Sequence, residues 1–325
     1  VPDALFRNDG EHFTDVGATA GVASLFGKGL GVVAGDFDLD GDQDIYVAND
    51  GVRNFYYRND EQRFKDIALQ NGAAYNGEGG PEAGMGVDAG DYDGDGDLDL
   101  FVTNFSRETN TLYRNDRAAG FKDVSPGTDA ANASFNQLGF GTFFFDADND
   151  ADLDLYIANG HVLDRIQILE ADLRYAQNDQ LLQNDGQGHY SDISATSGAA
   201  FAQALVSRGA ARGDYDNDGD LDVLVNHLNG PAALYRNDRP PGSHWLGLEL
   251  KDQAIGAQVH LTCDDRTQFR VVATSGTYLS AHDPRLHFGL GNCTRVEHID
   301  ILWPSGQTSE LSNVAIDRYL TVEAP

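Results

Sequence analysis

The chain has 325 residues and a formal net charge of −30, from 52 acidic and 22 basic side chains. This charge repels the phosphates of nucleic acids and of anionic lipids, and no apolar run approaches the roughly 20 residues of a membrane-spanning helix. We therefore expect neither a nucleic-acid partner nor membrane insertion.

A unit of about 55 residues recurs along the chain, and each copy predicts four short strands separated by turns. Glycine-rich apolar segments (29–35, 84–90, 138–145, 209–213) lead into four aspartate ladders, and β-type runs follow at 45–49, 100–104, 155–159 and 223–226. Third segments occur at 5–9, 56–60, 112–116, 182–185 and 234–238, and fourth segments at 13–16, 64–67, 121–124 and 190–193. Four strands per unit are typical of a propeller blade, so we predict an all-β protein with four to five encoded blades.

The order of the segments leaves a half-blade at the N-terminal end of this repeat region. The first copy has only third and fourth strands, and the last copy stops after its third strand. The half-blade either completes the last blade or meets strands from elsewhere. Because an unpaired strand edge invites another chain, a homo-oligomer or polymer through this edge is one expectation.

The aspartate ladder between the first and second strands of each unit predicts a calcium loop. Carboxylates at positions 1, 3, 5 and 9 with glycine at position 6 can surround one hard cation, and position 7 offers its backbone carbonyl. The expected side-chain ligands are Asp36, Asp38, Asp40, Asp44, Asp91, Asp93, Asp95, Asp99, Asp146, Asp148, Asp150, Asp154, Asp214, Asp216, Asp218 and Asp222, and the expected carbonyl donors are Asp42, Asp97, Asp152 and Asp220. We therefore expect about four Ca²⁺ ions, one per loop.

Solvated acidic turns are the alternative interpretation, but they would crowd like charges at a cost on the order of a few kcal/mol per loop. The third loop is expected to be the weakest, because Ala151 stands where the others have glycine. A positive φ at this position costs alanine about 1 kcal/mol relative to glycine. Position 12 is apolar in all four loops, so binding should be weak and suited to the millimolar calcium found outside the cytoplasm.

Two further features organise the rest of the chain. Leu163, Ile166, Leu169 and Leu173 recur at helical intervals and predict a short amphipathic helix over 163–177. The segment 239–242 reads as a linker, which gives two predicted domains, 1–238 and 243–325. Cys263 and Cys293 lie in the second domain and suggest one disulfide, with two buried thiols as the alternative.

The ladders and their Gly-Asp-Phe/Tyr segments resemble FG-GAP or VCBS-type repeats, and the C-terminal region resembles the ASPIC/UnbV module of the cartilage acidic protein-like family. The C-terminal resemblance rests on His244-Trp245-Leu246-Gly247, Ile255-Gly256-Ala257, Gly276-Thr277-Tyr278-Leu279-Ser280, Asp283 to Gly291, and Trp303-Pro304-Ser305-Gly306, with Asn159-Gly160-His161 as a further match. The resemblance implies calcium-stabilised blades, secretion and a β-sandwich-like C-terminal module. It also implies a ring of seven blades, more than this chain encodes.

Two functions remain open at this stage. The first is a secreted, extracellular or periplasmic protein with structural calcium, which binds an extracellular protein or glycan in adhesion or assembly. The alternative is an exported lyase or hydrolase acting on a carbohydrate-like substrate at the channel mouth, with His161 or His227 near the site. No motif of a known catalytic class occurs in the sequence, so an enzyme is the less favoured interpretation.

Overall fold

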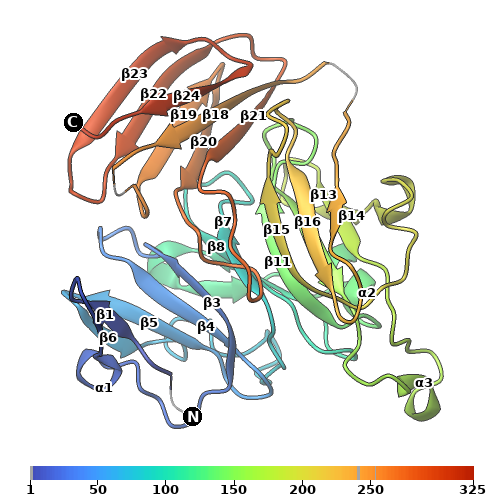
Figure 1. Ribbon diagram of the computed structural model, residues 1–325. Helices are drawn as coiled ribbons and strands as arrows, with labels where there is room; N and C mark the ends of the chain where they lie inside the picture. The colour runs from blue at the N-terminus through green and yellow to red at the C-terminus, as the bar shows by residue number, and fades with distance from the viewer. Residues whose placement is uncertain (1–2, 240–241, 253) are drawn as a thin grey trace.

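Small antiparallel sheets of one topology follow one another from β1 to β17 in the computed structural model, which describes residues 3–239, 242–252 and 254–325 (Figure 1). The strands are β1 (Phe6–Asn8), β2 (Phe13–Asp15), β3 (Gly29–Gly35), β4 (Asp44–Asn49), β5 (Phe55–Asp60), β6 (Arg63–Asp66), β7 (Val87–Gly90), β8 (Asp99–Val102), β9 (Thr111–Asn115), β10 (Phe121–Asp123), β11 (Gly139–Phe145), β12 (Asp154–Asn159), β13 (Gln180–Asn184), β14 (Tyr190–Asp192), β15 (Ser207–Gly213), β16 (Asp222–His227) and β17 (Ala233–Tyr235). The all-β prediction is confirmed.

Blades 1, 2 and 3 are the four-stranded sheets β3–β6, β7–β10 and β11–β14, in which each strand pairs with its neighbours in sequence. Within the part of the chain that the structure describes, blade 4 contains β15, β16 and β17, and the half-blade contains β1 and β2. In every blade the aspartate ladder joins the first strand to the second. The repeat unit deduced from the sequence is therefore the structural unit.

The glycine-rich first strands pack directly on one another from blade to blade. A Cβ atom built on Gly31 would lie 2.5 Å from the carbonyl oxygen of Met85, and one on Gly86 would lie 2.0 Å from that of Phe140. Side chains at these positions would push the blades apart. The glycines are thus required by the close approach of backbones at the propeller axis.

The half-blade lies beside blade 1. A Cβ on Gly21 would lie 2.3 Å from the carbonyl oxygen of Phe64, and a Cβ on Gly72 would lie 2.2 Å from that of Phe121, so half-blade and blade 1 are related as blades 1 and 2 are. Within the described residues, β1 and β2 pair with no strand of blade 4. Of the two arrangements open from the sequence, completion of the last blade is therefore not the one found in this chain.

The helix predicted over 163–177 is wrong in extent. The helices are one-turn or two-turn elements, α1 (Gly17–Ala20), α2 (Asp129–Ser134) and α3 (Ile166–Leu169), with 3-10 turns at Arg117–Ala119 and Ser194–Thr196. Short helices are stable only when a face is packed, and Ile168 and Leu169 of α3 are exposed because the segment extends away from the blades (Figure 1). No described helix is both long and apolar enough to cross a bilayer.

The C-terminal region forms two packed sheets with one core. The sheets have the orders β21-β18-β24 and β20-β19-β22-β23, with β18 and β24 parallel. The strands are β18 (His244–Leu250), β19 (Gln258–Cys263), β20 (Arg266–Val271), β21 (Leu286–Gly291), β22 (Val296–Leu302), β23 (Thr308–Val314) and β24 (Arg318–Val322). Leu246 and Phe288 of one sheet share a buried cluster with Val259 and Ile299 of the other. This arrangement matches the predicted sandwich, and the predicted boundary at 238–243 falls between β17 and β18.

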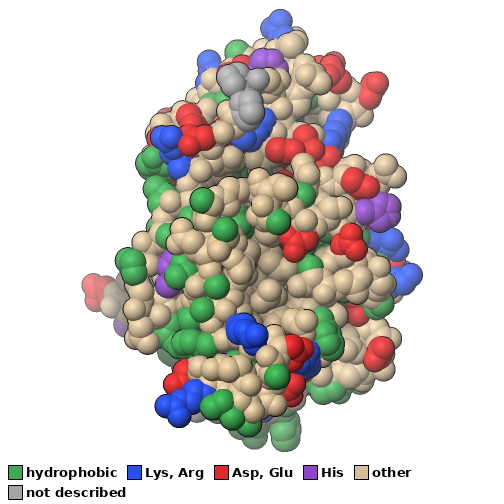
Figure 2. All heavy atoms as spheres, turned by 90° about the vertical axis from the view of Figure 1, so that its right-hand side faces the viewer, with side chains coloured by type: hydrophobic (Ala, Val, Ile, Leu, Met, Phe, Trp, Pro, Cys, Tyr) green, Lys and Arg blue, Asp and Glu red, His purple; other side chains and the backbone are tan. Residues whose placement is uncertain are grey.

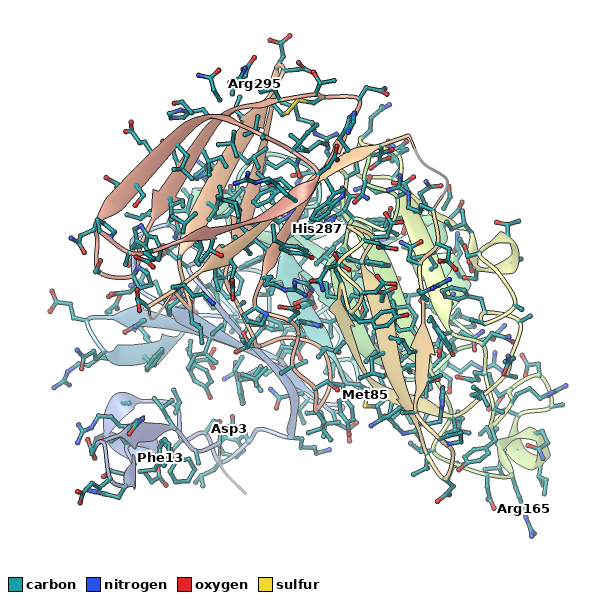
Figure 3. All side chains as sticks on the ribbon, turned by 45° about the horizontal axis from the view of Figure 1, so that its top comes forward. Asp3, Phe13, Met85, Arg165, His287 and Arg295 are labelled. Atoms are coloured by element: carbon teal, nitrogen blue, oxygen red, sulfur yellow. A yellow bond between two sulfur atoms is a disulfide. The ribbon has the colours of Figure 1, made fainter. Side chains whose placement is uncertain are left out.

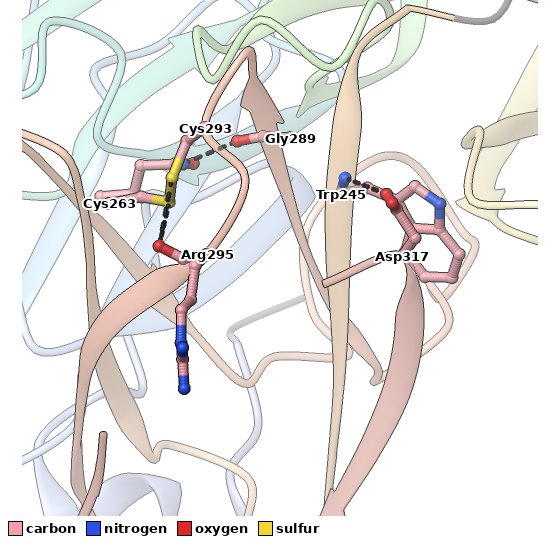
Figure 4. The surroundings of a disulfide bond; sticks show 7 residues. Trp245, Cys263, Gly289, Cys293, Arg295 and Asp317 are labelled. Carbon is pink, nitrogen blue, oxygen red and sulfur yellow. Dashed lines mark hydrogen bonds between the residues drawn. A yellow bond between two sulfur atoms is a disulfide. The ribbon is translucent and has the colours of Figure 1, made fainter. Parts of the chain in front are cut away.

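The predicted disulfide between Cys263 and Cys293 is present, with a Cα–Cα distance of 6.2 Å (Figure 4). Cys263 ends β19 in one sheet, and Cys293 follows β21 in the other. The bond therefore ties the two sheets of the C-terminal domain together.

The connection between β20 and β21 leaves the C-terminal domain and enters the centre of the propeller (Figure 1). Its fully buried Thr277 accepts a backbone hydrogen bond from Val87 at 3.3 Å and donates its hydroxyl to the carbonyl oxygen of Ala210 at 2.9 Å. The same connection also packs on the first strand of blade 4, where a Cβ built on Gly209 would lie 2.3 Å from Oγ of Ser280. The axis is thus occupied by a segment of the C-terminal domain, which the sequence did not predict.

Candidate metal centres

Each aspartate ladder folds into the same turn. In the first loop, Oδ1 of Asp36 accepts a hydrogen bond from the amide of Asp40 at 3.1 Å, and its Oδ2 accepts one from Gly41 at 3.0 Å. Oδ1 of Asp40 then accepts from the amide of Asp42 at 2.9 Å. Two of these bonds recur in the other three loops. The position-1 carboxylate accepts from the amide of position 6, and the position-5 carboxylate accepts from the amide of position 7. The spacing of the ladder therefore fixes the carboxylates on the inside of a tight turn.

The carboxylates of each loop converge. In every loop three of them bring one oxygen each within 4.8 Å of one another. The four groups are Asp36, Asp38 and Asp40; Asp91, Asp93 and Asp99; Asp146, Asp148 and Asp154; and Asp214, Asp216 and Asp218. Positions 1 and 3 belong to all four groups. The third member is position 5 in the first and fourth loops and position 9 in the second and third loops.

Some of these oxygens are buried without a hydrogen-bond donor in the described structure. They are Oδ1 of Asp91, Oδ1 of Asp93 and Oδ1 of Asp148. Asp91 is only 5% exposed, so its unpaired oxygen lacks water as well as a protein donor. A buried carboxylate oxygen without a partner is costly, and a hard cation would satisfy it. The residues present therefore fit a calcium ion.

The position-9 aspartate has a second role as a strut inside its blade. Oδ1 of Asp99 accepts from the amide of Asn115 at 2.7 Å, and its Oδ2 accepts from the amide of Tyr92 at 3.2 Å. Asp44, Asp154 and Asp222 make the equivalent pairs of bonds. Position 9 thus ties the loop to the third strand, in addition to any contact with an ion.

The asparagine of the third strand explains the recurring Arg-Asn-Asp turn. Nδ2 of Asn115 donates to the carbonyl oxygen of Phe37 in the preceding blade at 2.8 Å, and Asn184 donates to Tyr92 at 2.9 Å. Asn237 makes the same bond to blade 3. Each asparagine therefore joins its blade to the aspartate loop of the blade before it.

The position-7 side chains of the second and third loops pair with arginines, in agreement with a carbonyl role at this position. Asp97 pairs with Arg117 in its own blade at 2.5 Å. Asp152 pairs with Arg266, which belongs to the C-terminal domain. These arginines were missed because no local pattern in the sequence links them to the ladders.

Burial strongly perturbs the carboxylates at position 9. It raises the pKa of Asp44 to about 7 and that of Asp99 to about 9, and hydrogen bonds from neighbouring amides only partly offset this. The pKa of Asp146 at position 1 is raised to about 7 for the same reason, and repulsion from Asp150 adds to the effect. A cation would remove this penalty by favouring the charged form.

The third loop carries the strain expected from its alanine. Ala151 has a φ of 80°, while the glycines at the same position have φ values of 99° in the first loop and 95° in the fourth. The amide of Ala151 still donates to Oδ2 of Asp146 at 2.8 Å. The turn therefore forms in spite of the Cβ atom.

The two histidines considered for catalysis are structural in this fold. Nδ1 of the buried His161 accepts from the amide of Leu163 at 3.0 Å, so its Nε2–H faces Oγ of Ser106 at 3.3 Å. His227 replaces the asparagine that ends the second strand elsewhere, and its Nδ1 lies 2.7 Å from the carbonyl oxygen of Pro231. Neither His161 nor His227 lines the cavity at the propeller axis.

The cavity at the propeller axis has a volume of about 70 Å³ and is lined by titratable groups that include Asp88, Arg212, Arg270 and His287. His287 lies between the blades and the C-terminal sheets (Figure 3). Ligand pockets usually measure roughly 300 to 1,000 Å³, so this cavity suits a few waters rather than a sugar. Among the described residues, the axial cavity is therefore too small for a sugar.

The repeats and the C-terminal sandwich define a class of protein. Residues 36–102 and 91–157 match the model of the FG-GAP-like repeat, and residues 247–325 match the model of the ASPIC and UnbV domain. The chain thus contains FG-GAP-like repeats followed by an ASPIC/UnbV domain.

Its homologues across most of the chain are cartilage acidic protein 1 sequences. The Mus musculus protein is 26% identical over 332 residues, and the Homo sapiens protein is 25% identical over 339 residues. These alignments cover 94% of this chain but 48% and 46% of the relatives. The chain spans about half the length of the curated relatives it matches.

Among solved structures, an Agrocybe aegerita lectin that recognises non-reducing terminal N-acetylglucosamine aligns with a TM-score of 0.36. The identity is 14%, with coverage of 95% of this chain and 87% of the lectin. At this TM-score the likeness supports no argument about fold or function.

Proposed function

We propose that this chain is the calcium-binding propeller and ASPIC/UnbV part of a secreted protein with a binding, adhesion or assembly role outside the cytoplasm. The observation that carries the proposal is the convergence of three carboxylates in each of four loops, together with the unpaired buried oxygen of Asp91. Calcium would be structural: bound between the first and second strands, it would neutralise the loop and fix the carboxylates in place.

The ligand set follows from the geometry of the loops. Positions 1, 3, 5 and 9 would supply carboxylates and position 7 a carbonyl, because the side chains of Asp97 and Asp152 are engaged by arginines. Oxygen-only ligands favour calcium over the softer transition metals.

The proposed location rests on three supports. A disulfide persists in oxidising compartments, ladders without a bidentate position-12 ligand suit millimolar calcium, and the relatives carry the name cartilage acidic protein. A secreted, extracellular or periplasmic protein meets all three. The proposed partner is an extracellular protein or glycan.

The direct test is metal content and calorimetry on the purified chain. We expect about four calcium ions per chain and a rise in melting temperature on adding calcium to chelator-treated protein. Asp93→Asn should remove one site, whereas Asp129→Asn, an exposed aspartate outside the loops, should remove none. Unchanged melting temperature after chelation would contradict the structural role.

We also propose self-association through the half-blade, because its face is bare where the equivalent faces are covered. Phe6 is 59% exposed, whereas the equivalent Tyr57 and Tyr113 are at most 2% exposed. Val32 of β3 in blade 1 is 53% exposed because the described half-blade has no first strand to cover it, whereas β3 covers the equivalent Val87 of β7, which is fully buried. The bare face is therefore an unoccupied inter-blade face rather than ordinary surface.

A second copy of the chain is the proposed occupant. In the described part of the chain, blade 4 lacks the fourth strand of the other blades. Its third strand, β17, is therefore an edge strand, and Leu234 on it is 46% exposed. A head-to-tail contact would bring the half-blade of one copy beside blade 4 of the next. This contact propagates into a polymer unless it closes into a ring.

Light scattering on size-exclusion fractions over a wide concentration range tests self-association. We expect mass to rise with concentration and Phe6→Ser with Phe13→Ser to suppress the rise. Phe13 lies on the outer side of the half-blade (Figure 3). Leu169→Ser is the control, because Leu169 is 73% exposed on α3, which lies on the other side of the molecule from β1 in Figure 1, the side that Figure 2 turns toward the viewer. A monomer at every concentration would refute the contact.

The enzyme alternative has less support. A segment of the C-terminal domain fills the axis, and the cavity left there is about 70 Å³. We therefore propose binding rather than catalysis.

A further inference from the structure

In addition to the segment at the axis, the C-terminal domain contacts the propeller at the aspartate loops. One of these contacts is at the third loop. The guanidinium of Arg266 donates to the carbonyl oxygens of Asp150 at 3.1 Å and Ala151 at 3.0 Å, and it pairs with the carboxylate of Asp152. One side chain thus spans positions 5, 6 and 7 of the loop whose position 6 is strained. The amide of Gly291 adds a bond to the carbonyl of Asn149 at 2.7 Å.

The fourth loop is held by several groups of the same domain. The hydroxyl of Tyr319 donates to Oδ2 of Asp214 at 2.7 Å, and Arg285 donates to the carbonyl oxygen of Asp214 at 2.8 Å. His287 contacts the carbonyl oxygen of Gly219 through Nε2 at 2.9 Å. The ring of Trp245 fills the space over Gly219, where a Cβ would lie 2.0 Å from it.

The first and second loops meet the domain through Gln258 and Arg270. Nε2 of Gln258 donates to Oδ2 of Asp36 at 2.8 Å. The half-buried Arg270 lies near Asp91 and Asp146, and its charge offsets part of the rise in pKa that burial causes at both carboxyls. All four loops therefore face the C-terminal domain, and in the first and fourth a position-1 carboxylate is itself hydrogen-bonded by it.

We propose that docking of the C-terminal domain on the propeller and calcium binding by the four loops are linked, with Arg266 as the positioning residue of the third loop. This inference rests on the calcium sites of the proposed function. It adds that the ASPIC/UnbV domain hydrogen-bonds to the loops that would hold the ions, so that calcium binding strengthens docking of this domain and docking strengthens calcium binding.

The linkage follows from what each partner fixes. Calcium holds the position-1 carboxylates and the loop carbonyls in place, and these are the acceptors that the C-terminal domain uses. Without the ion, the converging carboxylates repel one another and the acceptors move. In the other direction, hydrogen bonds to ligand groups orient them, and removing such bonds typically costs about 10- to 100-fold in metal affinity. Linked binding is reciprocal by thermodynamic necessity.

Calorimetric calcium titration of the full chain tests the role of Arg266. We expect Arg266→Ala to weaken one of the four sites by at least about 10-fold and to leave the others near the wild-type affinity. Arg266→Lys should restore part of the loss, because it keeps the charge but loses the fork that spans two carbonyls. Arg295→Ala is the control, since Arg295 lies beside the disulfide with its side chain directed away from it (Figure 4).

Tryptophan fluorescence tests the docking. Trp245 packs on the fourth loop, and Trp303, the second of the two tryptophans, lies in the core of the C-terminal domain. In a Trp303→Phe background, we expect chelation to shift the Trp245 emission to the red and to raise amide exchange at Val87, which donates to Thr277, and at Gly291. Calcium should reverse both changes.

The outcomes separate the two proposals. If calorimetry detects no calcium, the proposed function fails. If calcium binds but Arg266→Ala keeps four sites of wild-type affinity, and Trp245 emission and amide exchange do not change, then the linkage alone is refuted. Loss of one site with a calcium-dependent Trp245 signal supports both.

Discussion

The hydroxyl of Tyr319 donates a 2.7 Å hydrogen bond to Oδ2 of Asp214, so the last strand of the C-terminal sandwich touches the first carboxylate of the fourth aspartate loop. The two residues are 105 positions apart in the sequence. A candidate metal loop of the propeller is therefore completed by a domain that carries no aspartate ladder.

Tyr319→Phe should weaken calcium binding at the fourth loop and lower the stability of the chain by about 1 to 3 kcal/mol. A hydrogen bond to a charged group is typically worth this amount, and the substitution leaves the packing of the ring on Trp245 intact. Calorimetry and denaturant unfolding with calcium present would measure both effects. Wild-type values in both experiments would show that the hydroxyl is energetically neutral.

Ala151→Gly should stabilise the chain by about 1 kcal/mol and raise the calcium affinity of the third loop, because glycine adopts the φ of 80° without strain. Gly41→Ala is the matched opposite change. It has a φ of 99° and no heavy atom within 4 Å of the new Cβ, so only backbone strain is added. We expect it to destabilise by a similar amount. Equal stability of both variants and wild type, measured by thermal unfolding, would argue against strain at position 6.

Calcium should stabilise the chain more at pH 8 than at pH 5. Burial raises the folded-state pKa of Asp44 to about 7 and of Asp99 to about 9, above the unfolded value near 3.8. The folded metal-free chain therefore holds protons that the unfolded chain releases, so its stability falls as pH rises from about 4 and levels off above the folded pKa values. Calcium replaces these protons. Melting temperatures with calcium and with chelator at several pH values would show this, and a shift that is constant with pH would contradict it.

Asn115→Ala should destabilise the chain by about 1 to 3 kcal/mol, because it leaves the buried carbonyl oxygen of Phe37 in the preceding blade without its 2.8 Å bond. Asn59→Ala is the control. Its Nδ2 donates to the carbonyl oxygen of Gln43 within its own blade, and among the described residues it bonds to no aspartate loop of a preceding blade. We expect the control to cost less in chemical denaturation. Equal losses would mean that the bond between blades adds nothing.

The period of the aspartate ladders and the alternating apolar runs were enough to predict the blades, the four loops and the strain at Ala151. These features are local, since a ladder and its two strands lie within about 25 residues and each blade repeats the same hydrogen bonds. The prediction of a helix over 163–177 was wrong because a short helix also needs a packed face, which local spacing does not provide. Its apolar spacing is helical, but no partner surface covers Ile168 and Leu169.

The sequence by itself determined the repeat, the carboxylate positions and the pairing of Cys263 with Cys293 as a candidate. Only the tertiary structure decided that the half-blade lies beside blade 1, that Thr277 fills the axis, and that Arg266 and Tyr319 complete two of the loops. Local spacing sets which carboxylates share a turn, because the backbone hydrogen bonds of the turn span only a few residues. Contacts between residues 105 or 115 positions apart depend on how two separately patterned sheets pack, and no periodicity in the chain encodes that.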